Sequence, residues 1–193
     1  MRIRTMLSIL LLIIAGLVSC KNSDDLNSSN ITANDISSSE KIPTLNLREV
    51  DEEGDLLTIQ FKILDEESEK PISDVEIFLY HADENGDYLP AIPGDETTAK
   101  YSGKIRTNAD GECLLETVVP RKYETNGNQH IHLHSITAEG YKNKGGVILF
   151  DHDVNDEVRQ WATDTGFGFI IKLEDRGDEK VGELVIKLNK EKE

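Results

Sequence analysis

The chain has 193 residues, with 37 Asp or Glu against 21 Lys or Arg, which gives a formal net charge of −16. A surface this acidic repels phosphate backbones and anionic lipid headgroups, so it argues against nucleic acid as a partner. Only two cysteines are present, at positions 20 and 113, and the first lies in an N-terminal targeting segment. No disulfide within the folded part is therefore expected.

Residues 1–19 have the features of a bacterial lipoprotein signal peptide. Two arginines precede an apolar stretch, residues 7–14, that is too short to span a bilayer comfortably. The run Leu17–Cys20 has the order of a lipobox, so we predict cleavage before Cys20 and lipidation of its thiol. The lipid would anchor the protein to the outer membrane or cell surface, on the periplasmic or extracellular side. The alternative, an uncleaved membrane anchor, fits the short apolar stretch less well.

Residues 20–47 are rich in Ser, Asn and Asp and have almost no periodic apolar pattern. Such a segment cannot bury enough apolar surface to fold, and we expect a flexible tether. Residues 48–193 then form one domain that is long enough to build a hydrophobic core.

The domain is predicted to be all-β, with the architecture of an antiparallel β-sandwich. Short runs rich in β-branched and aromatic residues alternate with turn signals such as Asn85-Gly86, Asp110-Gly111 and Gly145-Gly146. One hairpin is expected at residues 175–178, and one helical stretch at 155–162. The expected strands are 57–64, 75–80, 113–119, 131–138, 147–150, 167–173 and 184–188.

Four side chains form a candidate metal site: Tyr88, Tyr123, His130 and His132. Phenolate oxygen and imidazole nitrogen are donors that suit ferric iron better than calcium or zinc. On a strand, His130 and His132 project from the same face about 6.6 Å apart along the chain, so both rings can converge on one ion. His134 would lie about 13 Å from His130, and we expect it at the rim of the site rather than on the metal.

Simpler interpretations exist for each of these residues. Two histidines on one strand are often half-exposed side chains without a ligand. Tyr88 can be a turn aromatic that packs on the sheet edge, and Tyr123 can be a tyrosine that follows a strand-ending proline.

Several nearby residues are assigned other roles. We expect the aromatic residues Phe78, Tyr80, Phe150 and Trp161 to lie in the core, and His81 and His152 to lie at the surface or a pocket rim. The acidic run 83–87 is interpreted as a plain turn, because it lacks the later glutamate of a calcium-binding loop.

The order of these pieces over about residues 56–189 resembles the intradiol ring-cleavage dioxygenases, the family of protocatechuate 3,4-dioxygenase and the catechol 1,2-dioxygenases. The resemblance implies a β-sandwich catalytic domain with a non-haem Fe(III) ion held by Tyr88, Tyr123, His130 and His132. It further implies cleavage of a catechol-type aromatic ring with O₂. Tyr88 would be the labile ligand, with a catalytic role as proton acceptor, and Tyr123 the permanent one.

The chain also departs from the family pattern. Catechol-cleaving members have an Arg-Pro-x-His-Ile-His run, whose arginine stabilises charge on the substrate, whereas the corresponding residues here are Gly127-Asn128-Gln129-His130-Ile131-His132. Arg121 or Lys122 is an alternative source of positive charge. The segment between Tyr123 and His130 has roughly half the family's usual length.

Two other functions therefore stay open. The first is a non-catalytic, surface-tethered β-sandwich that binds a protein or glycan. The second is an iron enzyme that acts on a different aromatic or polyphenol.

Overall fold

The computed structural model describes residues 41–49, 54–122 and 127–192. The predicted signal peptide, Cys20 and most of the predicted tether lie outside the described residues, as does Tyr123. In the part of the chain that is described, no helix combines the length and apolar character needed to cross a membrane.

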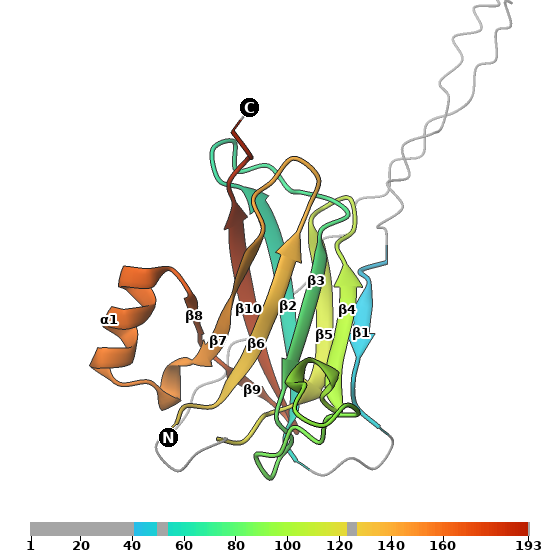
Figure 1. The fold of residues 1–193 in the computed structure, drawn as a ribbon, viewed down its shortest axis with the longest axis vertical. Coiled ribbons are helices and arrows are strands. Elements are labelled where there is room, and N and C mark those ends of the chain that lie inside the picture. Colours follow the sequence, from blue (N-terminus) through green and yellow to red (C-terminus); the bar gives the residue numbers. More distant parts are fainter. Residues whose placement is uncertain (1–40, 50–53, 123–126, 193) are drawn as a thin grey trace, which may run out of the picture. The chain divides into compact units, whose positions relative to one another are not determined.

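The described residues form two five-stranded sheets that enclose a common core (Figure 1). The first sheet has the order β1 (Thr44–Asn46), β5 (Glu112–Val118), β2 (Leu56–Asp65), β10 (Glu179–Leu188), β9 (Glu174–Arg176). The second has the order β4 (Tyr101–Arg106), β3 (Glu76–His81), β6 (His130–Thr137), β7 (Lys144–Phe150), β8 (Gly168–Ile171). Three short helices complete the fold: η1 (Glu96–Thr98), η2 (Asp151–Asp153) and α1 (Asp156–Thr165).

Strict alternation of apolar residues builds the core between the sheets. In β2 every second residue is buried, and Phe61 is fully enclosed. Ile77 of β3 and Ile131 of β6 contribute to the same cluster from the other sheet. Burial of one such side chain is worth about 1.5–3 kcal/mol relative to exposure, so the alternation itself specifies which face of each strand points inward. The predicted β-sandwich is confirmed in this respect.

The sheets are mixed, which corrects the expectation of an antiparallel sandwich. Three strand pairs run parallel: β2 with β10, β1 with β5, and β7 with β8. The β7–β8 connection carries α1, as a crossover between parallel strands requires. The other two pairs join strands that are distant in sequence, so no hairpin restricts their direction. Strand β1 lies inside the segment that was expected to be a tether.

Helix α1 begins at Asp156, one residue after the start expected from the sequence, and continues to Thr165. The side chain of Asn155 caps its first turn by accepting a hydrogen bond from the Val158 N–H, and Gly166 ends it in the left-handed conformation with φ +62°. Trp161 is 40% exposed on this helix, so its prediction as a core residue is wrong.

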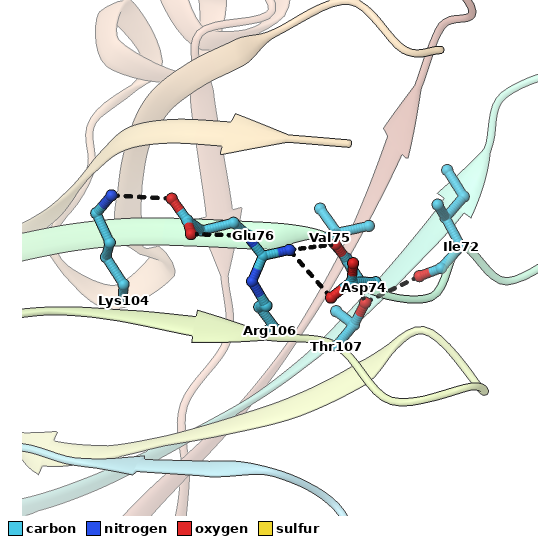
Figure 2. Close-up of polar contacts among 7 residues, drawn as sticks. All are labelled: Ile72, Asp74, Val75, Glu76, Lys104, Arg106 and Thr107. Atoms are coloured by element: carbon cyan, nitrogen blue, oxygen red, sulfur yellow. Dashed lines mark hydrogen bonds and ion pairs between the residues drawn. The ribbon is translucent and has the colours of Figure 1, made fainter. Parts of the chain in front are cut away.

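The outer face of the second sheet is charged at one end. Figure 2 shows Lys104 and Arg106 of β4 beside Glu76 of β3, with Arg106 also paired with Asp74. Exposed ion pairs of this kind contribute little to stability. They show that this end of the outer face is in contact with water. From Glu76 the same face continues along β3 to Tyr80, where the polar surface gives way to aromatic rings.

A buried carboxylate joins distant parts of the chain at the end of β2. Asp65 accepts hydrogen bonds from the N–H and hydroxyl of Ser68, both 2.7 Å, and from the Tyr141 hydroxyl at 3.0 Å, and it pairs with Lys190 at 3.4 Å. The Ser68 bonds, with smaller contributions from Tyr141 and Lys190, hold the pKa of Asp65 well below its usual value.

The stability of the domain should therefore depend on pH through Asp65. A depressed carboxyl pKa stabilises the fold fully above about pH 4, the unfolded value, and this contribution is lost as the pH falls further. Asp65→Asn is expected to lower the thermal midpoint by several degrees at pH 7 and to reduce the loss of stability between pH 5 and 3. Thermal unfolding followed by circular dichroism measures both, with the exposed Asp178→Asn as a control. A variant with an unchanged pH profile would contradict the assignment.

Candidate metal centre

The two histidines of the predicted site lie side by side on the outer face of β6. Ile131 and Leu133 alternate with them and are buried in the core, which turns His130 and His132 outward. Strand β6 is held between β3 and β7. The histidines therefore project from the middle of a sheet whose backbone is fixed on both sides.

The chain returns to this face after β3 through a tight turn. The Asp83 carboxylate accepts the N–H groups of Asn85 and Asp87 at 2.8 and 2.9 Å, and Gly86 adopts φ +92°. This is the plain turn expected from the sequence, with one carboxylate oxygen occupied by the turn itself. The reversal places Tyr88, which is only 8% exposed, against Ala82, Ala99 and Tyr80.

Three potential ligand atoms converge on this face. The Tyr88 hydroxyl oxygen lies 3.1 Å from Nε2 of His132 and 3.4 Å from Nε2 of His130, and the two Nε2 atoms are 3.0 Å apart. The point equidistant from all three lies about 1.8 Å from each, so the three atoms are close enough together to bind one first-row ion with bonds of about 2.0–2.1 Å. The structure thus brings together three of the four predicted ligands.

The hydrogen bonding of His130 and the burial of His132 both suit metal binding. Nδ1 of His130 donates a hydrogen bond to the carbonyl oxygen of Asn128 at 2.7 Å, so Nε2 is the ring nitrogen that is left for a metal ion. Burial, together with the neighbouring His130, lowers the pKa of His132 to about 4. His132 is therefore neutral at pH 7 and does not need to lose a proton before it can bind an ion.

The donor set fits ferric iron. It combines one ionisable phenol with two imidazoles, and a trivalent ion has the charge needed to bind the phenol as phenolate. Within residues 41–49, 54–122 and 127–192, no group of three or more His, Cys, Asp or Glu side chains is placed to bind a metal. Among the described residues, Tyr88 is therefore the third donor beside His130 and His132. These three residues form the ligand trio.

His134 lies apart from the trio, as predicted. The pairing of β6 with β3 shifts between Leu133 and Ser135, so His134 falls in a bulge and is exposed. Its ring contacts the edge of Phe78, with centroids 5.1 Å apart.

The segment that carries the family's arginine is built differently here. The backbone N–H of Gln129 donates to the Asp153 carboxylate at 2.6 Å, and its side-chain amide donates to the Pro120 carbonyl at 3.0 Å. Lys122 pairs with the same Asp153 carboxylate at 2.5 Å. Of the two cations proposed from the sequence, Lys122 thus forms an ion pair with Asp153. The side chain of the other, Arg121, is exposed.

His81 corrects one expectation from the sequence. It is fully buried, stacks on Tyr101 with ring centroids 4.9 Å apart, and forms hydrogen bonds with Ala82 O and the Thr117 hydroxyl. Burial lowers its pKa to about 4. The prediction of a surface position was wrong because His81 belongs to the inward set of β3, in phase with Ile77.

Tyr80 was missed as a site residue. Expected in the core, it lies on the outer face, and its ring stacks on His132 with centroids 4.5 Å apart. The period-two pattern of β3 requires Tyr80 and His81 to point in opposite directions, but it does not show which of the two points inward.

Comparison with models of protein families and with curated proteins gives no match. Solved structures do match. The 3-chlorocatechol 1,2-dioxygenase of Rhodococcus opacus 1CP is 25% identical with a TM-score of 0.59, covering 77% of this chain and 65% of that enzyme. The catechol 1,2-dioxygenase of Acinetobacter radioresistens is 18% identical with a TM-score of 0.62, covering 79% and 58%.

A shorter protein matches over nearly its whole length. The dioxygenase domain of a dioxygenase–carbohydrate-binding protein fusion from Streptomyces sp. SirexAA-E is 23% identical with a TM-score of 0.61, covering 79% of this chain and 92% of that domain. This chain thus spans less than two thirds of the catechol dioxygenases but most of the single-domain structure. The resemblance read from the sequence is confirmed: the protein has the fold of the intradiol ring-cleavage dioxygenases.

Proposed function

We propose that the protein is a non-haem Fe(III) dioxygenase that cleaves a catechol-type aromatic ring with O₂. One observation carries the proposal: the Tyr88 oxygen and the Nε2 atoms of His130 and His132 converge within 3.4 Å of one another. They do so on a fold shared with proteins described as catechol and hydroxyquinol dioxygenases. Neither the convergence nor the fold alone would specify this chemistry.

The residues would divide the work as follows. His130 and His132 would stay bound as neutral donors, and Tyr123 would add a permanent phenolate. Ferric iron would supply a Lewis acid and a template for the aromatic diol. Tyr88 would leave the metal when the diol binds and would take one of its protons, which makes it the general base. Its place at the end of a turn, rather than on a strand, suits a side chain that must move.

The missing arginine favours a substrate other than a catechol carboxylate, with the same ring-cleavage chemistry. It also keeps a non-catalytic binding module as the alternative function. The family's arginine is replaced by the amide-rich segment Gly127–Gln129, and Lys122 is paired with Asp153. A site with less positive charge stabilises an anionic substrate less well. A neutral catechol or polyphenol is therefore a better first substrate to test than a catechol carboxylate.

Iron content and colour test the proposal. The domain purified in air is expected to contain about one iron per chain and to be red-brown, since ferric tyrosinate absorbs visible light. Oxygen uptake with catechol should yield the ring-opened dicarboxylic acid that contains both oxygen atoms of O₂. Protein that stays colourless and metal-free after incubation with ferrous or ferric iron would contradict the proposal and favour the binding module. Colour without turnover of catechol would point to another aromatic substrate.

A further inference from the structure

The two histidines of the candidate centre are oriented by different means. His130 is fixed by the hydrogen bond from its Nδ1 to Asn128 O. For His132, the hydrogen bonds found among the described residues involve Nε2 alone. Its ring instead lies flat on Tyr80, with centroids 4.5 Å apart and an interplanar angle of 15°. A metal-binding histidine usually donates a hydrogen bond from its second nitrogen to an outer partner, and this bond orients the ring. For His132, the contact that can orient the ring is the stack on Tyr80.

The sheet itself places Tyr80 there. Tyr80 and His132 are directly opposite each other in the antiparallel pairing of β3 with β6, and both point to the outer face. Cross-strand neighbours of this kind are close enough for ring contact without any adjustment of the backbone. Tyr80 also touches Tyr88, with ring centroids 5.9 Å apart, so it borders two members of the trio.

We infer that Tyr80 is a positioning residue, whose ring sets the plane of His132 and thereby aims Nε2 at the point shared with Tyr88 and His130. The torsion that turns an imidazole about its attachment is broad, so a ring without an outer partner can rotate out of the plane in which Nε2 points at the other two donor atoms. The part of this inference that concerns metal binding rests on the proposed function, whereas the position of the ring does not.

Three variants distinguish the effect of the Tyr80 ring from that of its hydroxyl and from a general loss of aromatic contacts. Tyr80→Leu removes the ring, Tyr80→Phe keeps the ring and removes the hydroxyl, and Phe78→Leu is the matched control. Phe78 lies two residues earlier on the same face of β3, and its contact is with His134 instead of His132. Unfolding midpoints of all three identify any general loss of stability.

Metal affinity is the first measurement. In calorimetric titrations of the metal-free protein with Co²⁺, Tyr80→Leu is expected to bind about 10–100-fold more weakly than the wild type, the usual cost of losing an outer partner of a metal-binding histidine. Tyr80→Phe and Phe78→Leu should bind like the wild type. Equal weakening in Tyr80→Phe would overturn the inference, because the hydroxyl and not the ring would then be responsible.

The second measurement needs no metal. In the NMR spectrum of the metal-free protein, the Hε1 and Cε1 signals of His132 should show the ring-current shift of a stacked aromatic neighbour. This shift should persist in Tyr80→Phe and disappear in Tyr80→Leu. An unchanged His132 signal in Tyr80→Leu would overturn the inference. A wild type that shows the shift but binds no metal would support the placement of the ring and reject the proposed iron function.

Discussion

His132→Ala is expected to lower the iron content of the aerobically purified protein to a small fraction of the wild-type value, and His130→Ala should do the same. Each substitution removes one of only three described donors that converge, and the two that remain hold an ion at least about tenfold more weakly, because even outer partners of a ligand contribute that much. Iron is measured by elemental analysis of protein at known concentration.

His134→Ala is the matched control for this loss. It removes an imidazole from the same strand, but one that the bulge in β6 leaves exposed and in contact with Phe78. The variant should therefore keep about one iron per chain. Iron loss as severe as in His132→Ala would contradict the ligand assignment, because His134 would then also be needed to hold the ion.

The two tyrosines should differ when each is replaced by phenylalanine. Tyr88→Phe removes the group proposed to accept the substrate proton, so turnover should fall by about 10²- to 10⁴-fold, the usual contribution of general base catalysis. Its iron should stay coloured through Tyr123. Tyr123→Phe should abolish or strongly shift the visible band, because the permanent phenolate is lost. Absorption spectra and oxygen-uptake rates of the two variants measure these effects.

The outcome separates ligand exchange from a static site. If both variants kept the wild-type band, neither phenol would bind the iron. If Tyr88→Phe kept full turnover, the proton of the diol would have to reach another base, and the labile role assigned to Tyr88 would be wrong. If both variants folded normally and only Tyr88→Phe lost its colour, Tyr88 would be the permanent ligand and Tyr123 the labile one.

Much of the site could be predicted from the sequence because it depends on local periodicity. The alternation around Ile131 puts His130 and His132 on one face whatever the neighbouring strands are. The position of Tyr80 depended on knowing which face of β3 points inward. Both sets of that strand contain large side chains, Ile77 and Leu79 on one side and Phe78 and Tyr80 on the other, so the pattern alone does not decide.

Two of the strands that were missed, β4 and β1, have sequences that lack the usual strand signals. Strand β4 has a glycine near its centre, and the space around Gly103 is tightly packed. A Cβ at Gly103 would lie 3.0–3.3 Å from side-chain atoms of Leu45, in β1, and Leu47, just after it. Strand β1 has only three residues in a Ser- and Asn-rich stretch. Both elements exist because of tertiary contacts, which no local pattern contains.

The parallel pairing of β2 with β10 has a consequence for how the chain reaches its folded state. Strand β2 is among the first strands of the domain to be synthesised, and β10 is the last, so their residue pairs are roughly 120 positions apart, a separation typical of slow, non-local folding. Until residues 179–188 are available, one edge of β2 has unpaired backbone groups beside the apolar side chains of Leu57, Ile59 and Phe61. An open edge of that kind is where a nascent chain aggregates. Closure of the first sheet is thus postponed until residues 179–188 have been synthesised, and chaperones can act on this protein at that edge until then.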